Sequence, residues 1–324
     1  MQAIIYKKYG TADELSLQEI EKPVPKPNEV LVRIHAASIN SWDWDMLKGD
    51  HFIIRLISGV FEPKYKILGA DIAGIIEAIG NEVTDFEAGD AVFGDIAESG
   101  FGGFAQYVSV PAKLLAKKPD GITFIQAAAI PQAGLLALQG LRYKSEIKDG
   151  QKILINGAGG GAGTLAVQYA KLFRTEVTCV DKEEKFEMLR SLGADICIDY
   201  TKQDYTKTGK QYDKILDVIA HRNISDYKRA LAPNGVFAMV GGSMGGLLLQ
   251  LMLFGKLMKF SGNKKIGIMG YKPNRNDLNT LATLCEEKKV VPVIDRTFTL
   301  AETAQAFRHF AEGNFKGKII ITMS

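Results

Sequence analysis

The chain has 324 residues, of which 46% are hydrophobic and 24% charged, a composition typical of soluble proteins with sizeable packed cores. Its formal net charge is only +3, with 40 basic residues dispersed among 37 acidic ones, so a nucleic-acid partner is not expected. The three cysteines, Cys179, Cys197 and Cys285, have no CxxC spacing, which argues against both a disulfide scaffold and a zinc knuckle.

The first hundred or so residues predict a β-rich domain. Short strands such as "QAIIY", "EVLVRIHAAS" and "ADIAGIIEAIG" are separated by turns rich in Pro, Gly and Asn. Lys7 and Lys8 follow the first strand before an apolar segment of signal-peptide length develops, so we expect a cytoplasmic protein.

From about residue 150 the chain alternates strand patterns with helical ones. The strands are "KILIN", "EVTCVD", "ICIDY", "KILDVI" and "VFAMVG", and a more polar segment follows each. This alternation predicts βαβ units around a parallel sheet, and therefore an α/β fold. After "KKIGIMG" come a helix, "NRNDLNTLATLCEEKKV", a further strand and helix, and a closing strand, "GKIIITM".

One apolar stretch, residues 230–254, carries no charge and approaches the length of a membrane span. Pro233, Asn234 and four clustered glycines interrupt it. We therefore predict a buried strand with its exit turn, "VFAMVGG", followed by a short apolar helix, "LLLQLMLFGKLMKF", rather than a transmembrane helix.

The stretch "KILINGAGGGAGTLAVQYAK" places five glycines among the seven residues from Gly157 to Gly163. A strand that turns sharply into a helix leaves backbone N–H groups free to bind an anion. Gly160, Gly161 and Gly163 fall where a sharp turn, an approaching pyrophosphate and close helix packing require glycine, and Thr164 begins the helix. We predict a dinucleotide-binding loop; a purely structural turn is the alternative.

Asp181 ends the next strand, eighteen residues after Gly163, where a carboxylate can accept both hydroxyls of an adenosine ribose. The same carboxylate would repel a 2′-phosphate, so NAD(H) is favoured as the cofactor. NADP(H) stays open because Lys182 or Lys185 could reach a phosphate. Alternatively, Lys185 bonds the ribose and Lys182 is solvated surface charge.

Six segments spread over nearly the whole chain carry a family resemblance: "NSWDWDMLKGD", "ILGADIAGIIEAIGNEVTDFEAGDAVFG", "GGFAQYVSVP", "AAAIPQAGLLALQGL", "ILINGAGGGAGTLAVQYAK" and "RSLGADICIDY". Together they resemble the medium-chain dehydrogenase/reductase superfamily, in its zinc-free quinone oxidoreductase branch. The resemblance implies a GroES-like β-rich catalytic domain over residues 1–120, completed by 271–324. It also implies a Rossmann domain over 121–270, with the active site in the cleft between the two domains.

The zinc alcohol dehydrogenases of this superfamily carry a Cys and a His-Glu pair in their metal region. Asn40 stands at the Cys position here, and Ala70 with Asp71 replaces the His-Glu pair. The four-cysteine structural zinc lobe has no counterpart in the sequence either. The comparison therefore predicts a protein that binds no metal.

A protein without zinc would lose the main route to oxidising simple alcohols, whereas a quinone or enone could still accept hydride from NAD(P)H. The acceptor oxygen then needs hydrogen-bond donors, and Asn40 is the first candidate, with a turn-shaping role as the alternative. Asp43 matches an acidic position common in the superfamily, where a structural hydrogen bond competes with a cofactor contact. Tyr65, His51 and Tyr271 are available by type as proton donors, and water is another source.

The resemblance also assigns residues to the nicotinamide and adenine ends of the cofactor. Ala133 and Gly134 match a loop near the nicotinamide, Tyr200 matches the adenine side, and Gly241 with Gly242 matches the strand exit beside the nicotinamide ring. Each of these residues could instead serve packing or turn formation.

Two apolar segments bear on the acceptor. "HFIIRLISGVF", residues 51–61, and "LLLQLMLFGKLMKF" are expected to border the cleft, which predicts a lipophilic acceptor such as a long-chain enone, alkenal or isoprenoid quinone. Packing on their own domains is one alternative, and peripheral membrane contact beside Lys256 and Lys259 is another.

"KKIGIMG" resembles the edge strand through which related enzymes pair, so we expect a homodimer. The leading hypothesis is thus an NAD(P)H-dependent reductase of quinones or α,β-unsaturated carbonyls. A carbonyl or alcohol dehydrogenase that has lost zinc, and a cofactor-binding protein with little turnover, are the competing hypotheses.

Overall fold

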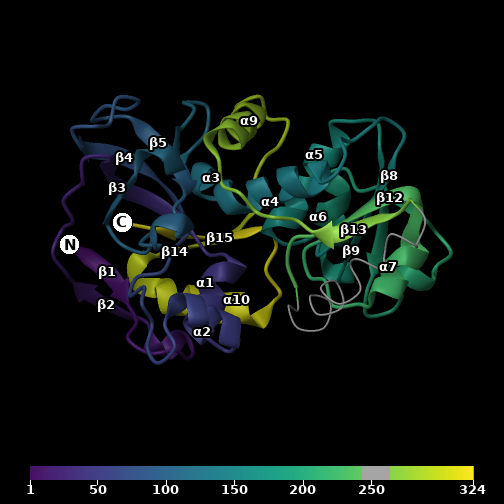
Figure 1. The fold of residues 1–324 in the computed structure, drawn as a ribbon, viewed down its shortest axis with the longest axis horizontal. Coiled ribbons are helices and arrows are strands. Elements are labelled where there is room, and N and C mark those ends of the chain that lie inside the picture. The colour runs from purple at the N-terminus through teal and green to yellow at the C-terminus, as the bar shows by residue number, and fades with distance from the viewer. Residues whose placement is uncertain (243–262, 324) are drawn as a thin grey trace. The chain divides into compact units, whose positions relative to one another are not determined.

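The structure, a computed structural model, describes residues 1–242 and 263–323 (Figure 1). The chain divides into two compact units, one formed by Met1–Ala133 with Pro273–Ser324 and the other by Gly134–Lys272. The sequence placed the first boundary earlier, at residue 120. The first unit extends further because α3 (Phe124–Ala128) packs on its sheet, where the Phe124 ring stacks on His35 with 4.3 Å between ring centroids.

The first unit is built around a seven-stranded sheet in the order β14-β15-β3-β4-β5-β7, with β6 paired to β3. Alternate side chains of β3 (Glu29–Ser38) point to opposite faces, so Val32 and Ile34 are buried in the core whereas Arg33 is exposed. β15 (Lys318–Thr322) pairs antiparallel with β3, which returns the end of the chain to its first domain.

The other strands and α-helices of the first unit are β1 (Gln2–Ile5), β2 (Ser16–Glu19), β4 (Asp71–Ile79), β5 (Ala91–Asp95), β6 (Tyr107–Pro111), β7 (Leu115–Lys117), β14 (Ile294–Thr299), α1 (Ser41–Lys48), α2 (Phe52–Ser58), α9 (Arg275–Glu286) and α10 (Thr303–Glu312). Strands β1 and β2 form a separate two-stranded sheet.

Helix α2 forms within the apolar segment 51–61. Its Ile54 is buried in the core of the first unit, but Phe52 is 73% exposed and Phe61, just beyond the helix, is 97% exposed. Packing on its own unit therefore leaves most of this apolar surface uncovered. The other predicted apolar helix, residues 247–260, lies outside the described residues.

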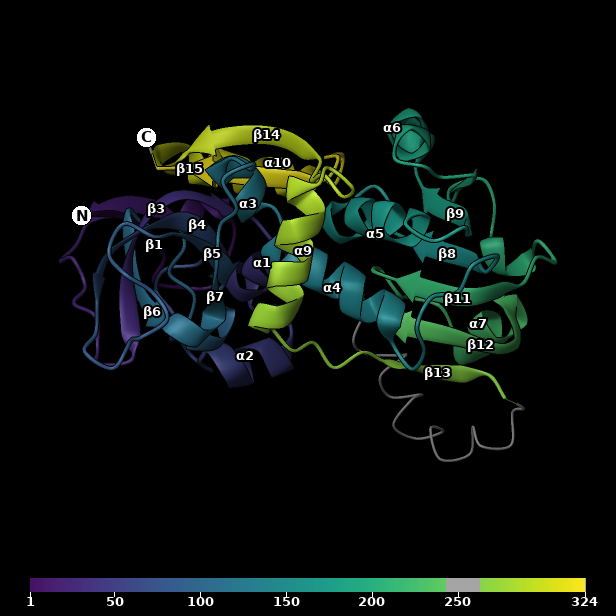
Figure 2. The ribbon, with the colours of Figure 1, turned by 90° about the horizontal axis from the view of Figure 1, so that it is seen from above.

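The second unit contains a six-stranded parallel sheet in the order β10-β9-β8-β11-β12-β13, which confirms the predicted α/β fold (Figure 2). This is the strand order of a dinucleotide-binding sheet, in which ligands bind beyond the strand ends where the order reverses. Here that point lies between β8 and β11. The strands and α-helices of the second unit are β8 (Lys152–Asn156), β9 (Glu176–Asp181), β10 (Ile196–Asp199), β11 (Tyr212–Asp217), β12 (Leu231–Met239), β13 (Lys265–Ile268), α5 (Gly161–Lys171), α6 (Phe186–Ser191) and α7 (Ile224–Ala230). They follow α4 (Pro131–Arg142), which contains the boundary between the two units at Ala133 and Gly134.

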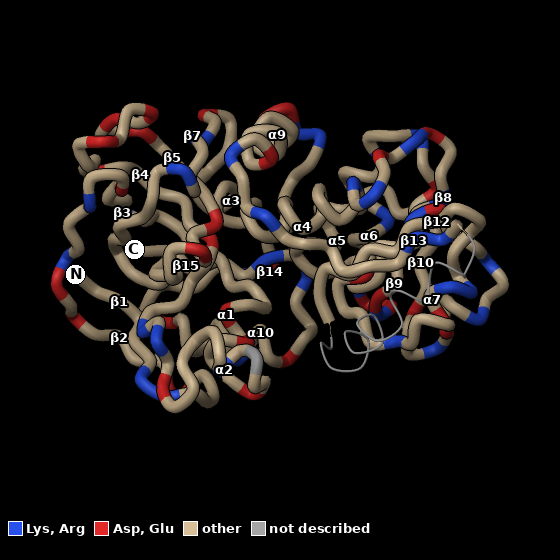
Figure 3. The backbone as a smooth tube through the Cα atoms, in the orientation of Figure 1, with Lys and Arg blue, Asp and Glu red and all other residues tan. Residues whose placement is uncertain are grey.

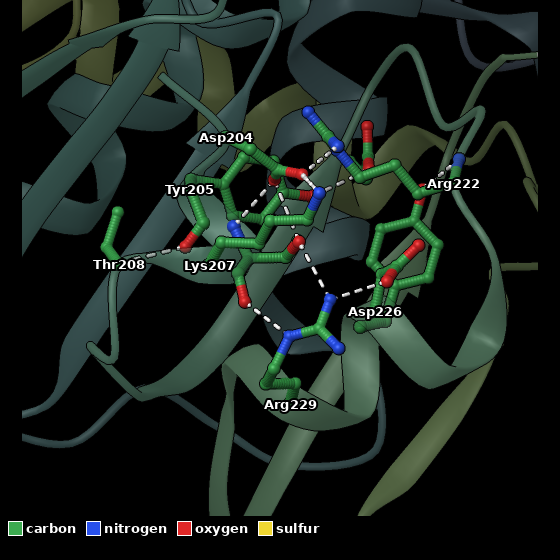
Figure 4. A network of polar contacts seen from close by, with 10 residues as sticks. Asp204, Tyr205, Lys207, Thr208, Arg222, Asp226 and Arg229 are labelled. Carbon is green, nitrogen blue, oxygen red and sulfur yellow. Dashed lines mark hydrogen bonds and ion pairs between the residues drawn. The ribbon is translucent and has the colours of Figure 1, made fainter.

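A polar network fastens the segment that follows β10 to α7 (Figure 4). Arg222 Nη1 lies 3.0 Å from Asp204 Oδ2. Arg229 donates from Nε to the Thr206 carbonyl at 2.8 Å and from Nη2 to Asp226 Oδ1 at 2.6 Å. Arg229 lies on α7 and Arg222 shortly before it, so their contacts with Thr206 and Asp204 hold the segment after β10 in a defined path.

Acidic and basic residues are interspersed along the backbone of both units, in agreement with the dispersed charge of the sequence (Figure 3). The strand predicted within residues 230–254 is β12, and its exit turn includes Gly241 and Gly242. No helix within residues 1–242 and 263–323 is both long and apolar enough to cross a membrane.

Candidate active site

The glycines of the loop between β8 and α5 have different structural roles. Gly157 has a φ of +79°, so the left-handed turn falls here rather than at Gly160, where we expected it. A Cβ on Gly163 would lie 2.3 Å from the Gly157 carbonyl oxygen and 2.5 Å from Ala158 Cα, so Gly163 is required for close helix packing. A Cβ on Gly160 would meet only the Gly157 oxygen, at 3.7 Å, and therefore points into open space.

Helix α5 begins at Gly161, and its N-cap is Gly160, which has no side chain to cap the first turn. Thr164 does not fill this role, because its hydroxyl donates back to the Gly161 carbonyl at 3.0 Å. The N–H groups of the first turn therefore lack a side-chain acceptor and carry the positive end of the helix dipole. This arrangement, with the open space beside Gly160, fits the pyrophosphate of a dinucleotide.

Asp181, at the end of β9, is oriented by the same loop. Its Oδ2 accepts the Gly159 N–H at 2.7 Å, its Oδ1 accepts the Lys182 N–H at 2.9 Å, and Lys185 Nζ lies 3.5 Å from Oδ1. Both Asp181 and Lys185 are buried, and Lys185 is an ion-pair partner of the carboxylate. Gly159 leaves room for this pair, since a Cβ there would come within 2.4 Å of Lys185 Cδ, a role that the sequence did not reveal.

The remaining predicted cofactor residues lie on both units. Tyr200 is 41% exposed and follows β10, whose last residue pairs with Asp181 across the sheet. Gly241 and Gly242 are required by packing, because their Cβ atoms would lie 2.4 Å from the Val218 oxygen and 2.2 Å from the Ala220 oxygen, respectively. Ala133 ends the first unit and is buried. Their contacts with a cofactor stay predictions.

In the first unit, a buried polar cluster surrounds Asn40, which is 6% exposed. Asn40 Nδ2 donates to Asp71 Oδ2 at 3.0 Å, and Lys318 Nζ donates to Asn40 Oδ1. Lys318 Nζ also donates to the Ile39 carbonyl at 3.1 Å and lies 3.4 Å from Asp71 Oδ2. Asn40 is therefore hydrogen-bonded to both members of a buried ion pair, Asp71 and Lys318. It also precedes α1 as the N-cap of that helix.

Asp71 is fully buried and accepts further hydrogen bonds from two sides. Ser38 Oγ donates to its Oδ2 at 3.1 Å, and the Gln132 N–H donates to its Oδ1 at 3.0 Å. Burial lowers the pKa of Lys318, although the neighbouring carboxylates of Asp71 and Asp43 oppose that shift. Sequence reasoning did not identify Lys318. The one sequence signal is that Lys318 is the single charged residue of the apolar closing strand, and a charge that is buried in such a strand needs a partner.

Asp43 makes the kind of structural hydrogen bond that the sequence analysis gave as the alternative to a cofactor contact. It is 0% exposed, and its two carboxylate oxygens accept the N–H groups of Asn40 and Gly69, both at 2.9 Å. Burial raises the pKa of Asp43 to about 7, against the opposing effect of these two hydrogen bonds. These two hydrogen bonds fix the backbone at Asn40 and at Gly69, and a contact of Asp43 with cofactor or substrate stays a prediction.

Comparison with known proteins identifies the family. One family model, described as an alcohol dehydrogenase GroES-like domain, matches residues 26–120, and another, described as zinc-binding dehydrogenase, matches residues 192–321. The chloroplast envelope quinone oxidoreductase homolog of Arabidopsis thaliana is 31% identical over 99% of this chain and 98% of its own length. The chain belongs to the medium-chain dehydrogenase/reductase superfamily, in its quinone oxidoreductase branch.

Two further members of this superfamily are similar over most of the chain. The chloroplastic NADPH-dependent alkenal/one oxidoreductase of Arabidopsis thaliana is 30% identical over 99% of this chain and 79% of its own length. The solved structure of the quinone oxidoreductase from Coxiella burnetii covers 100% of this chain and 99% of its own, with a TM-score of 0.89 at 27% identity. The chain is thus an oxidoreductase that uses a nicotinamide cofactor. A cytoplasmic location stays a prediction, since the names of both Arabidopsis relatives place those proteins in the chloroplast.

The donor set at the metal position of the superfamily does not fit zinc. A carboxamide, Asn40, and a methyl group, Ala70, stand where thiolate and imidazole ligands would be needed, and Asp71 is already paired with the Lys318 ammonium. Within the described part of the chain, no three His, Cys, Asp or Glu side chains gather into a metal-binding group.

Proposed function

We propose that this member of the superfamily transfers hydride from NADH to a lipophilic quinone or α,β-unsaturated carbonyl, and that it does so without zinc. The observation that carries the proposal is the buried Asn40 carboxamide, bonded to Asp71 and Lys318 at the position of a metal ligand. The names of its relatives, which include quinone and alkenal/one oxidoreductases, support the acceptor class.

Asn40 is suited to bind a carbonyl oxygen on which negative charge develops. Its amide nitrogen has two hydrogens, and Asp71 accepts one of them, which leaves one N–H for the acceptor. A bound nicotinamide supplies the hydride, whereas Asn40 stabilises the oxygen at the other end of the conjugated system. A conjugated acceptor suits such a donor because its charge develops away from the carbon that receives the hydride.

The cofactor would be held by the second unit. The first turn of α5 would bind the pyrophosphate beside Gly160, and Asp181 would accept the ribose hydroxyls. We propose NADH rather than NADPH, because a 2′-phosphate would meet the buried Asp181 carboxylate. Replacing Asp181 with Ser is expected to raise the kcat/KM for NADPH relative to NADH, and an unchanged ratio would remove the argument for NAD.

The apolar surface of α2 supports a lipophilic acceptor. Phe52, Leu56 and Ile57 are exposed on this short helix, and Val60 and Phe61 continue the surface. Exposed apolar area of this kind is characteristic of surfaces that contact apolar ligands or partners. A Leu56→Ser variant is expected to raise the KM for a long-chain enone while leaving the KM for a short enone unchanged.

One assay panel tests the function. In the reductive direction, purified protein is mixed with NADH or NADPH and with 9,10-phenanthrenequinone, an enone or a saturated ketone. In the oxidative direction, it is mixed with oxidised cofactor and an alcohol. The absorbance of the reduced nicotinamide is followed in both. Turnover confined to the conjugated acceptors, and unaffected by EDTA, is the expected result. Reduction of saturated ketones would favour the carbonyl dehydrogenase hypothesis, and tight cofactor binding without any turnover would favour a non-enzymatic role.

We also propose a homodimer formed through β13. Among the described strands, β13 lies at the end of the second unit's sheet, and its Ile268 is 39% exposed. An apolar edge strand of this kind readily pairs with a second copy. Elution at twice the chain's mass is expected on a calibrated sizing column, with a shift to monomer mass for Ile268→Lys; a wild-type monomer would refute the dimer.

A further inference from the structure

We infer that Lys318 is a positioning residue: its ammonium group sets the orientation of the Asn40 carboxamide so that an N–H, and not the carbonyl oxygen, faces the acceptor. The inference rests on the proposed function, in which Asn40 donates to the acceptor oxygen. It assigns a reaction-specific role to a residue at the far end of the chain, 278 positions from Asn40.

The hydrogen-bonding capacities of the neighbours leave the amide one orientation. A lysine ammonium has donors and no acceptor, and an ionised carboxylate has acceptors and no donor. Asn40 Oδ1 must therefore face Lys318, and Nδ2 must face Asp71, which is the arrangement observed. A flipped amide would set N–H against ammonium and carbonyl against carboxylate, so both contacts would be repulsive.

The two partners of the amide are themselves fixed. Asp71 is held by the Ser38 hydroxyl and the Gln132 N–H, and Lys318 donates a further hydrogen bond to the Ile39 carbonyl. These residues come from the end of β3, the start of β4, the start of α4 and the start of β15. Because both partners are buried and bonded from several sides, the orientation of the amide is set before an acceptor binds, as donor preorganisation requires.

Lys318 could instead serve only to neutralise the buried Asp71 carboxylate. In that case its loss would reduce stability, and any loss of activity would be independent of Asn40. If Lys318 acts through Asn40, its loss should matter only while the amide is present. A double-mutant cycle distinguishes the two roles, because a shared mechanism makes the effects of the two substitutions strongly non-additive.

The cycle compares Asn40→Ala, Lys318→Met and the double variant, with kcat/KM for 9,10-phenanthrenequinone and for an enone as readouts. Loss of one preorganised donor typically lowers the rate by about 100-fold or more, which is the expected effect of Asn40→Ala. Lys318→Met is expected to lower kcat/KM about tenfold or more in the wild-type background and less than about twofold in the Asn40→Ala background. Equal factors in the two backgrounds would overturn the inference.

Lys214 provides a matched control. It is another buried lysine, and its ammonium group donates to the Ser145 carbonyl at 2.6 Å and to the Ser145 hydroxyl at 3.0 Å, in the second unit. Lys214→Met also removes a buried ammonium but touches neither Asn40 nor Asp71. Its kcat/KM is expected to stay within about twofold of wild type. NADH affinity, measured by fluorescence for every variant, verifies that the protein is folded.

Nitrogen-15 NMR of the Asn40 side chain gives a readout that needs no turnover. The Asn40 amide signals are assigned by their loss in Asn40→Ala, and the N–H bonded to Asp71 is expected to exchange slowly in wild type. In Lys318→Met that protection is expected to fall at least about tenfold, because one of the contacts that hold the amide in its orientation is lost. Unchanged protection would overturn the inference. Absent turnover of every conjugated acceptor would refute the proposed function instead, and the NMR result would still decide the orientation of the amide.

Discussion

Substitution of Gly160 and of Gly163 by Ala separates the functional glycine of the loop from the structural one. At Gly163 the added Cβ would lie 2.3 Å from the Gly157 oxygen, more than 1 Å inside ordinary van der Waals contact, so α5 must shift away from β8. Such overpacking typically costs about 1–3 kcal/mol. At Gly160 the φ of −86° suits any residue, and the nearest atom lies at 3.7 Å, so only the loss of a glycine N-cap, about 1 kcal/mol or less, is expected.

The effect on cofactor binding should differ from the effect on stability. The Gly160→Ala methyl group would occupy the space that a pyrophosphate needs in order to reach the N–H groups of α5. Losing one hydrogen bond to a charged group costs about 1.5–3 kcal/mol, which corresponds to a roughly 10- to 150-fold weaker affinity for NADH. The expected Gly160→Ala protein is therefore nearly as stable as wild type and binds NADH poorly.

Urea unfolding of the cofactor-free proteins and NADH fluorescence titrations measure the two quantities separately. Gly150→Ala controls for the general effect of adding a methyl group to a loop glycine, although its φ of +78° adds strain of its own. If Gly160→Ala binds NADH as tightly as wild type, the open space beside Gly160 is not the pyrophosphate site. The glycine loop would then be a structural turn, and the cofactor assignment would lose its main support.

Three further predictions concern stability. Burial raises the pKa of Asp43 to about 7, so the native state keeps a proton that the unfolded chain loses near pH 4. The free energy of unfolding of wild type relative to Asp43→Asn should therefore fall between about pH 4 and 7 in urea titrations, and a constant difference would contradict this. Burial lowers the pKa of Lys214 to about 8, so above that pH the native state has lost a proton that the unfolded chain still binds. The free energy of unfolding of wild type relative to Lys214→Met should therefore rise from about pH 8 to 10, and a constant difference would argue against burial of the charge. Arg275 donates to the carbonyls of Leu115 at 2.9 Å and Ala112 at 2.8 Å. Arg275→Ala should therefore lower the free energy of unfolding by about 1–3 kcal/mol, and unchanged stability would show that water replaces these bonds.

Local pattern was sufficient to predict the second unit. Strands β8 to β12 appear as apolar runs because a parallel sheet buries both of its faces, and the glycine loop lies next to such a run. Sequence reasoning placed the turn at Gly160 rather than Gly157, because loop glycines look alike until their φ angles are known. The role of Gly159 escaped it for a related reason, since the Lys185 side chain that crowds Gly159 is distant in sequence.

The first unit was harder to predict, because its site is assembled from segments far apart in the chain. Asn40 and Asp71 were singled out by their positions in the family motifs, but no periodicity links either of them to Lys318. Asp43 was a candidate because it matches an acidic position common in the superfamily. Its complete burial favours the structural alternative, and the burial of a polar residue on a short helix is not visible in the sequence.

Stability alone is a poor explanation for the Asp71–Lys318 pair. Burying two charges carries a desolvation penalty that their attraction often fails to repay, and apolar residues of similar size are frequently as stable at such positions. Here the pair spans β4 and β15, is fully enclosed, and bonds both ends of one carboxamide. An apolar pair could hold the two strands together equally well, but it could not distinguish the two ends of the Asn40 amide. The retained charges are therefore better explained by the orientation that they impose on Asn40 than by the strands that they join.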